Sequence, residues 1–213
     1  MFTGIITDIG EVREVQQRGD LRARIGTSYD TKGIDIGASI ACDGVCLTVI
    51  ELGADWFDVE ISAETVSKTN IGTKGWPNGR RLNLECALKV GDELVGHIVS
   101  GHVFGCIEVL EVEQDELNMR IVFERPANLR PYLLNKGFVA LNGCSLTIAE
   151  VTAETFTVCL IPETRDVTIF GQTKVGDKVN LEIDPSTQAT VDTIKELMAS
   201  GEFAELIATV NNA

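Results

Sequence analysis

The sequence is poor in positive charge. It holds 18 Lys and Arg residues against 32 Asp and Glu residues, a formal net charge of −14 with His counted as neutral. Proteins that bind nucleic acid normally carry basic patches that match the phosphates, and anionic membrane surfaces attract clusters of Lys and Arg. The charge balance therefore argues against nucleic acids and membrane surfaces as partners.

Long apolar runs and a leader-like start are also missing. No segment approaches the ~20 apolar residues of a membrane span, and no basic region followed by an apolar stretch opens the chain. The six cysteines form no Cys-x-x-Cys pair, and His97 and His102 lie near no dense cluster of carboxylates or thiols. We therefore expect free thiols, a cytoplasmic location and no bound metal.

What the sequence does contain is a duplication. The segment GVCLT at 44–48 returns as GCSLT at 143–147, an offset of 99 residues, and after a two-residue insertion in the first copy NLE at 83–85 returns at 180–182. A period near one hundred residues is too long for a solenoid, whose repeats span roughly 20 to 50 residues, but it fits a small domain. The 213 residues therefore predict two related domains.

Most of the duplicated region has the pattern of short strands. Apolar or alternating runs such as 39–42, 47–50 and 56–61 are separated by turn signals, including Asp43-Gly44 and Asn142-Gly143. Small domains of this kind protect their sheet edges best by closing the sheet. We predict an all-β fold of two similar closed antiparallel Greek-key β-barrels in tandem, over residues 1–96 and 97–185, with a C-terminal α-helix over 186–213.

The helical signal is concentrated at the C-terminal end. Asp-Pro-Ser-Thr at 184–187 is a start signal. The apolar residues that follow share one stripe: Val191, Ile194, Leu197 and Met198, continued by Phe203, Leu206 and Ile207. This stripe packs either on its own barrel or against copies in other subunits, and the pattern leaves both open. Short helical turns are also expected over 64–69, 163–168 and 126–135.

The two copies differ where chemistry could differ. Cys46 stands opposite Ser145, and Ile5 stands opposite His102. A lone cysteine in an apolar strand is commonly an inert core thiol, and a histidine beside glycine is either a surface residue or a group that transfers protons near neutral pH. The Glu-Thr pairs at 64–65 and 163–164 suit helix caps or ligand contacts equally. We expect two similar but chemically unequal pockets.

Six motifs, in order and with family spacing, resemble the riboflavin synthases, a family with tandem lumazine-binding repeats. These motifs are MFTGI at 1–5, GHIVSGH at 96–102, KGF at 136–138, NGCSLT at 142–147, LIPET at 160–164 and NLEIDP at 180–185. The resemblance covers essentially the whole chain.

The resemblance implies the last step of riboflavin biosynthesis. Two molecules of 6,7-dimethyl-8-ribityllumazine dismutate, and a four-carbon unit moves from one to the other to give riboflavin and 5-amino-6-(D-ribitylamino)uracil. It implies no cofactor, a homotrimer joined by C-terminal helices, and an active site between the first barrel of one subunit and the second barrel of another. Association with lumazine synthase is left open.

The resemblance also implies the substrate-binding residues. In the first pocket these are Gly4, Ile5, Ile6, Ser39, Cys46, Leu47, Thr48, Glu60, Ile61, Ser62, Ala63, Glu64 and Thr65. In the second pocket they are Gly101, His102, Val103, Lys136, Ser145, Leu146, Thr147, Cys159, Leu160, Ile161, Pro162, Glu163 and Thr164. Glu60 would meet the ribityl hydroxyls. It stands where an aspartate is common in relatives, so the length of this side chain departs from the family pattern.

Catalytic roles are expected for six residues. His102 and Thr147 would handle protons, with Ser145 and Asp184 assisting. Cys46 would position or activate the partner substrate, and Phe2 would lie near the reacting rings.

Two other functions are weighed against this one. A non-catalytic lumazine or flavin carrier of the antenna type would keep the first pocket and lose the second-copy motifs, which are present here at 100–102, 145–147 and 184–185. A flavin-dependent oxidoreductase would need a nicotinamide domain with a glycine-rich βαβ unit, for which the chain has neither motif nor room.

Overall fold

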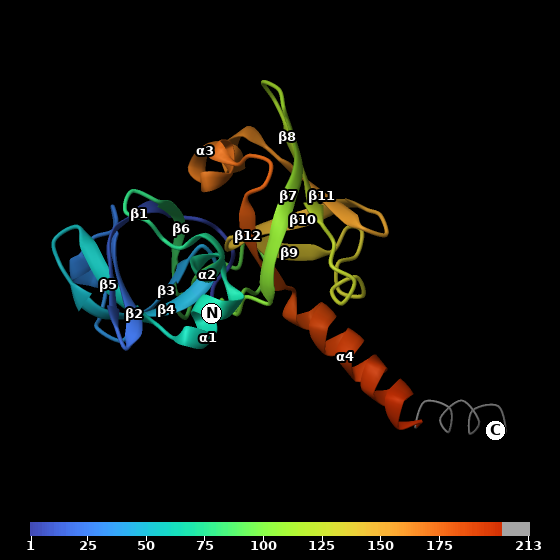
Figure 1. Cartoon of the computed structure of the whole chain (residues 1–213), viewed down its shortest axis with the longest axis horizontal. Helices are drawn as coiled ribbons and strands as arrows, with labels where there is room; N and C mark the ends of the chain where they lie inside the picture. The colour runs from blue at the N-terminus through green and yellow to red at the C-terminus, as the bar shows by residue number, and fades with distance from the viewer. Residues whose placement is uncertain (202–213) are drawn as a thin grey trace.

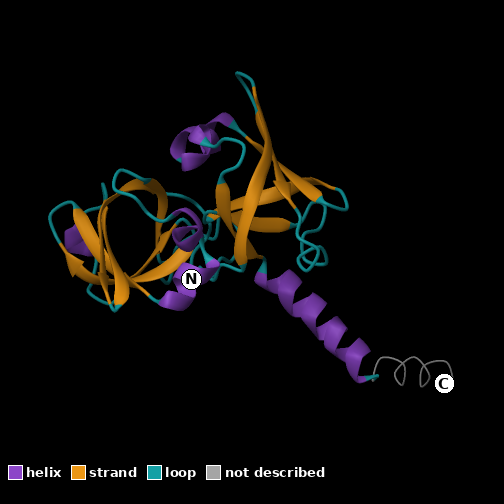
Figure 2. Ribbon diagram, in the orientation of Figure 1, coloured by secondary structure: helices purple, strands orange, loops and turns teal. Residues whose placement is uncertain are grey.

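A computed structural model describes residues 1–201, apart from the side chains of residues 73 and 74. It contains two closed barrels of six antiparallel strands each, side by side in Figures 1 and 2, which confirms the predicted fold class. The first barrel has the strand order β1-β2-β5-β4-β3-β6. Its strands are β1 (Asp8–Arg18), β2 (Asp20–Gly26), β3 (Ser39–Cys42), β4 (Val45–Leu52), β5 (Trp56–Ile61) and β6 (Arg81–Cys86).

The second barrel repeats this topology, with the order β10-β11-β8-β7-β12-β9. Its strands are β7 (Gly105–Gln114), β8 (Met119–Glu124), β9 (Phe138–Leu141), β10 (Cys144–Val151), β11 (Thr155–Leu160) and β12 (Lys178–Ile183). The duplicated strands β4 and β10 share the same alternation of buried and exposed residues. Period-two patterning therefore sets the inward face of each strand, and the apolar interior of each barrel is filled by side chains.

The predicted turns are confirmed at the two matching hairpins. Asp43 and Gly44 have φ values of +47° and +77°, and Asn142 and Gly143 have values of +42° and +78°. Two successive positive φ values are typical of the type I′ turn, which asparagine or aspartate followed by glycine adopts readily. The local sequence therefore fixes the register of β3 with β4 and of β9 with β10.

Short helices follow β5 and β11 where the sequence predicts helical turns. The helical elements are η1 (Thr31–Gly33), α1 (Ala63–Lys68), α2 (Asn70–Lys74), α3 (Pro162–Val167), η2 (Ile169–Gln172) and α4 (Pro185–Ser200). The helical candidate at 126–135 was wrong, because this segment forms turns. Pro131 lacks the N–H that a helix requires, and the Arg125 side chain donates to the carbonyls of Arg130 and Leu133, both at 2.8 Å.

Asparagine side chains join the barrels in a nearly two-fold arrangement. The Asn83 amide donates to the carbonyl of Asn142 at 3.0 Å, and the Asn180 amide donates to the carbonyl of Asp43 at 2.8 Å. Each asparagine also accepts from a backbone N–H of the opposite barrel: Asn180 from Asn70 at 2.7 Å, and Asn83 from residue 169 at 2.8 Å. These buried groups are satisfied only when the two barrels meet in this one orientation.

The segments that precede β1 and β7 cross between the barrels. Phe2 and Val99 form an antiparallel bridge, with backbone hydrogen bonds of 2.7 and 3.0 Å. Beyond the bridge Ile6 packs into the core of the second barrel, whereas Val103 packs against the core of the first. The segment before β1 therefore completes the second barrel, and the segment before β7 completes the first. The predicted domain boundaries after residues 96 and 185 stay predictions.

Helix α4 projects away from both barrels (Figure 1), and none of its residues is buried. Its stripe residues Ile194 and Met198 are 45% and 64% exposed. Close to the barrel, the helix is held by Tyr132, whose hydroxyl hydrogen-bonds Asp192 and accepts from Lys195. The stripe does not pack on its own barrel, and its packing against copies stays a prediction. The predicted stripe residues 203, 206 and 207 lie outside the described residues.

Within residues 1–201, none of the helices has the length and apolar character needed to cross a membrane. All six cysteines are free thiols, as the sequence predicts.

Candidate functional site

Most of the polar side chains predicted for the site lie on the outside of the barrels, on and beside β4 and β10. In the first barrel Leu47 points into the core, while Cys46 and Thr48 point outward, half-buried and exposed. Ser39 on β3 pairs with Thr48. Glu60 follows Val59, which pairs with Val49 of β4, and is exposed on β5. These side chains form an outer surface beside α1, which we call the first site.

The first site is completed by the segment that leads into the second barrel. The Cys46 N–H donates to the carbonyl of Gly101 at 3.0 Å. Gly101 has a φ of +81°, and a Cβ added to it would lie 2.5 Å from the Cβ of Cys46, so this approach requires glycine. The next residue, His102, is exposed, and its backbone N–H donates to the hydroxyl of Ser100.

The second site has the same design. The Ser145 N–H donates to the carbonyl of Gly4 at 2.8 Å. Gly4 has a φ of +76°, and a Cβ there would lie 2.6 Å from the Cβ of Ser145. Ile5 is 40% exposed and Ile6 is buried. Thr147 and Cys159 are exposed on the outer face beside α3.

This geometry exchanges two of the predicted groups. The sequence assigns residues 4–6 to the first pocket and residues 101–103 to the second. In the structure, residues 4–6 lie on the second barrel and residues 101–103 on the first. The predicted grouping by repeat was wrong, because the two segments cross before each barrel closes.

Two buried glutamates hold the crossing segments. Glu85 accepts from the backbone N–H of Thr3 at 2.6 Å and of Gly4 at 2.9 Å, and Glu182 accepts from those of Ser100 and Gly101 at the same distances. Burial raises the pKa of the Glu85 carboxyl, against the lowering effect of these hydrogen bonds. The sequence analysis gives these glutamates no role. Their recurrence in the repeated Asn-Leu-Glu motif is the signal that could have identified them.

The remaining predicted binding residues lie where strands β5 and β11 lead into short helices. Ile61 and Leu160 are buried and anchor these strand ends. Ser62 caps α1 by accepting from the Thr65 N–H at 3.2 Å. The other members flank the helix starts: Ala63 and Glu64 of α1 are exposed, as are Ile161 and Glu163 at α3, whereas Pro162 and Thr164 are half-buried. Leu146 lies on β10 instead and is buried.

The two sites differ in charge. Lys136 is exposed and has a φ of +65°, at the position that the first repeat fills with Gly37, where φ is +89°. A left-handed conformation costs a non-glycine residue about 1 to 2 kcal/mol. A lysine in this conformation places a cation at the second site that the first site does not have at the matching position.

A buried histidine that sequence reasoning left without a role touches the second site. The His97 Nδ1 atom lies 2.6 Å from the Ser145 hydroxyl, and its ring stacks on Phe138 with centroids 5.1 Å apart. His97 is only 6% exposed. Burial lowers the pKa of its imidazole, while the charge of Asp184 acts in the opposite direction. The signal in the sequence is its place in GHIVSGH, but no pattern there pairs it with Ser145.

Two of the predicted catalytic residues, Phe2 and Asp184, make contacts that hold the structure together. Phe2 is 1% exposed and packs between the barrels against Cys46, Ala140 and Val99. Asp184 is the N-cap of α4 and accepts from the Thr187 N–H at 2.7 Å. Phe2 therefore holds the N-terminal segment against Cys46, and Asp184 holds the start of α4.

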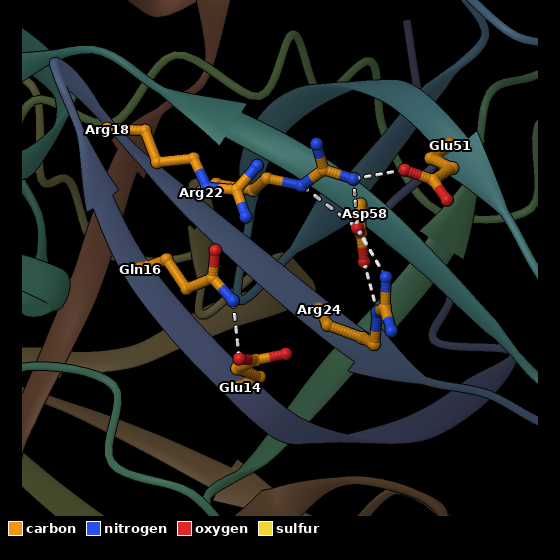
Figure 3. Close-up of a pocket in the computed structure, with 7 residues that line it drawn as sticks. All are labelled: Glu14, Gln16, Arg18, Arg22, Arg24, Glu51 and Asp58. Carbon is orange, nitrogen blue, oxygen red and sulfur yellow. Dashed lines mark hydrogen bonds and ion pairs between the residues drawn. The ribbon is translucent and has the colours of Figure 1, made fainter.

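A separate polar pocket of about 180 Å³ lies on the outer face of the first barrel (Figure 3). Asp58, at 1% exposed, accepts from both Arg22 and Arg24. The Arg24 guanidinium also lies 3.5 Å from the centroid of the Trp56 ring. The buried carboxylate is thus neutralised within the chain, and the pocket contains none of the predicted site residues. No group of three or more residues suited to hold a metal ion occurs in residues 1–201.

Comparison with known proteins shows which family the two barrels belong to. The lumazine binding domain model matches residues 3–87 and again residues 100–184. Riboflavin synthase of Brucella abortus (strain 2308) is 47% identical over 190 residues, covering 86% of this chain and 93% of that protein. Riboflavin synthase of Escherichia coli (strain K12) is 39% identical over 207 residues, covering 96% of both.

The fold recurs in a solved structure. LumP complexed with 6,7-dimethyl-8-(1'-D-ribityl) lumazine has a TM-score of 0.76 at 22% identity, over 85% of this chain and 98% of that one. At this identity the likeness concerns the fold.

Proposed function

The chain belongs to the riboflavin synthase family, with two lumazine-binding domains in tandem, and we propose that it makes riboflavin by dismutation of 6,7-dimethyl-8-ribityllumazine. One molecule donates a four-carbon unit to the other, which becomes riboflavin, and the donor becomes 5-amino-6-(D-ribitylamino)uracil. The observation that carries the proposal is the pair of sites with one design and unequal side chains. A reaction between two identical molecules needs similar sites, which must also differ so that one molecule donates and the other accepts.

Much of the rate enhancement then comes from orientation. Holding two reactants in the reacting geometry contributes about 7 to 11 kcal/mol. The remaining chemistry is removal of a proton from the C7 methyl of one lumazine and nucleophilic addition at C7 of the other. The electron-poor heterocycle delocalises the anion, so acid–base assistance of roughly 10²- to 10⁴-fold suffices.

The proposed roles follow the side chains at each site. At the first site His102 handles protons, and Cys46 positions or activates the substrate. At the second site Thr147 handles protons with the assistance of Ser145, and Lys136 supplies positive charge. Asp184 assists from the start of α4, and Phe2 fixes the crossing segment behind Cys46. The outward residues of β3–β5 and β9–β11, with α1 and α3, bind the ring and the ribityl chain.

The proposed assembly is a cytoplasmic homotrimer joined by α4. In it, the first site of one subunit faces the second site of another, and no cofactor takes part. The exposed stripe of α4 supports this arrangement, because an amphipathic helix that does not pack on its own barrel has apolar surface left to bury. Association with lumazine synthase belongs to the same proposal.

A non-catalytic lumazine or flavin carrier is the alternative. It is not favoured, because curated relatives at 39–47% identity over most of the chain are riboflavin synthases. The second site also keeps polar groups at Ser145 and Thr147, with a cation at Lys136.

The test is incubation of the purified protein with the lumazine, without added cofactor, followed by chromatography of the products. We expect riboflavin and the pyrimidine in equal amounts. Bound lumazine that persists unchanged would identify a carrier and contradict the proposal.

A further inference from the structure

A tyrosine of the second barrel holds helix α4 beyond its first turn. The Tyr132 hydroxyl donates to the Asp192 carboxylate and accepts from the Lys195 Nζ atom at 2.9 Å. The same ammonium lies 4.3 Å from the centroid of the Tyr132 ring. Asp192 and Lys195 are three positions apart, so both side chains meet Tyr132 from one face of the helix. We call these three residues the tyrosine clamp.

The loop at 125–135 fixes Tyr132 to the second barrel. The Arg125 side chain donates to the carbonyls of Arg130 and Leu133, both at 2.8 Å. Leu129 and Leu133 are buried in the core of the second barrel, and Tyr132 packs against that core. This loop, which forms turns where the sequence predicts a helix, therefore presents Tyr132 to α4 from a fixed position.

The clamp also decides which face of α4 is turned outward. Successive residues of an α-helix are about 100° apart around its axis. The stripe residues Ile194, Leu197 and Met198 therefore stand at least about 120° around the axis from Asp192. Ile194 and Met198 are 45% and 64% exposed. A barrel that holds Asp192 thus turns much of the apolar stripe away from itself, on a helix that projects from both barrels (Figure 1).

The clamp departs from the repeat. Counting back 99 residues, the offset between Lys136 and Gly37, the position of Tyr132 falls on Gly33. Strand β6, the counterpart of β12, leads into irregular chain over 87–98, whereas β12 leads into α4. Both sides of the clamp therefore belong to the second copy, although the barrel topology is the same in the two copies.

We infer that the tyrosine clamp directs α4 of each subunit toward the α4 helices of two other copies of this chain. This inference rests on the proposed function, which includes the trimer. A helix held only by its N-cap at Asp184 would point in many directions, and only the fraction that points correctly associates. The clamp raises that fraction before association and so lowers the ordering cost of assembly. The exposed stripe supplies the apolar surface that the copies bury against one another.

Tyr132→Phe tests the clamp with little disturbance of the barrel. Phenylalanine keeps the ring against the core and removes both hydrogen bonds to α4. We expect the subunit concentration at which half of the trimer dissociates to rise at least about tenfold, as measured by sedimentation velocity. Dissociated subunits of the variant should match the wild type in helix content by circular dichroism and in melting temperature. An unchanged dissociation concentration, or destabilised subunits, would overturn the inference.

An exchange of the two helix residues tests the contacts themselves. Asp192→Lys and Lys195→Asp each leave Tyr132 with two side chains of like charge, so each should weaken the trimer. The double exchange restores one donor and one acceptor for the Tyr132 hydroxyl and should recover much of the wild-type association. Glu196→Lys is the matched control, because it makes the same charge change as Asp192→Lys at an exposed residue outside the clamp and the stripe. Equal weakening by Glu196→Lys, or a double exchange no better than the single variants, would show that helix charge decides assembly and not the clamp.

Proton NMR distinguishes a failure of this inference from a failure of the proposed function. Overhauser contacts between the Tyr132 ring and the Lys195 methylenes should be present in the wild-type protein, and their absence would overturn the clamp. A wild-type protein that is monomeric at every concentration would overturn the role in assembly. A wild-type trimer that makes no riboflavin from the lumazine would contradict the proposed activity instead, and would leave the results on the clamp standing.

Discussion

At the scale of single residues, the two positions where the chain crosses between the barrels, 4 and 101, require glycine. Gly4 and Gly101 combine positive φ with backbone contact against Ser145 and Cys46. Their carbonyls accept from the N–H groups of those same residues. Each glycine thus places a chain segment directly against the polar residue that the reaction is proposed to use.

Replacement of Gly101 by alanine should damage the first site. The new Cβ would lie 2.5 Å from the Cβ of Cys46, and overpacking of this kind costs about 1 to 3 kcal/mol beyond the left-handed backbone. Gly79→Ala is the matched control, because Gly79 has a φ of +84° with nothing within 4 Å of an added Cβ. We expect denaturant unfolding to show the larger loss for Gly101→Ala, together with weaker lumazine binding. Equal losses in the two variants would mean that the close contact relaxes freely.

At the scale of elements, the start of α4 links the second barrel to the proposed assembly. Strand β12 ends at Ile183, and Asp184 caps the helix through the Thr187 N–H and hydroxyl. Burial lowers the pKa of His97, and the charge of Asp184 partly opposes this effect. Asp184 thus has two roles that can be separated, a cap and a nearby negative charge.

Substitution of Asp184 should separate these roles. Asp184→Ala removes the cap, which costs about 1 kcal/mol, and should weaken both the trimer and turnover. Asparagine caps about as well as aspartate, so Asp184→Asn should keep the trimer and lower turnover only if the charge takes part. Sedimentation and steady-state kinetics measure the two effects. Full activity in Asp184→Asn would exclude a catalytic role for the carboxylate.

At the scale of the whole molecule, the sites need a second subunit in the proposed arrangement. The first and second sites each lie on an outer barrel surface, and α4 extends away from both barrels with its stripe exposed (Figure 1). Removal of the chain from Ser186 onward should therefore abolish trimers and riboflavin formation together.

A milder pair of variants tests the same idea in the full chain. Ile194→Asp places a charge on the exposed apolar stripe, and Thr193→Asp places it beside the stripe. We expect the first to dissociate the trimer and the second to leave it intact, as measured by light scattering. For the truncation from Ser186 onward, a monomer that still makes riboflavin would refute the shared active site.

The sequence by itself determined the duplication, the two barrels and their matching hairpins. These follow from local physics, because period-two alternation and Asp-Gly or Asn-Gly turns specify strands and hairpins within a few residues. It also identified Cys46, Ser145 and Thr147 as the places where the copies carry polar groups. Conversely, the helix expected at 126–135 failed, since Pro131 and the Arg125 side chain favour turns there.

The tertiary structure alone decided which barrel each crossing segment completes and which histidine meets Ser145. The sequence places Ile6 and Val103 in the pockets of their own repeats, and no local pattern indicates that each packs against the core of the other barrel. The contact of His97 with Ser145 and that of Gly4 with Glu85 join residues 48 and 81 positions apart. Contacts of such separation are set by how whole barrels pack, because each buried polar group must find its partner across the interface between them.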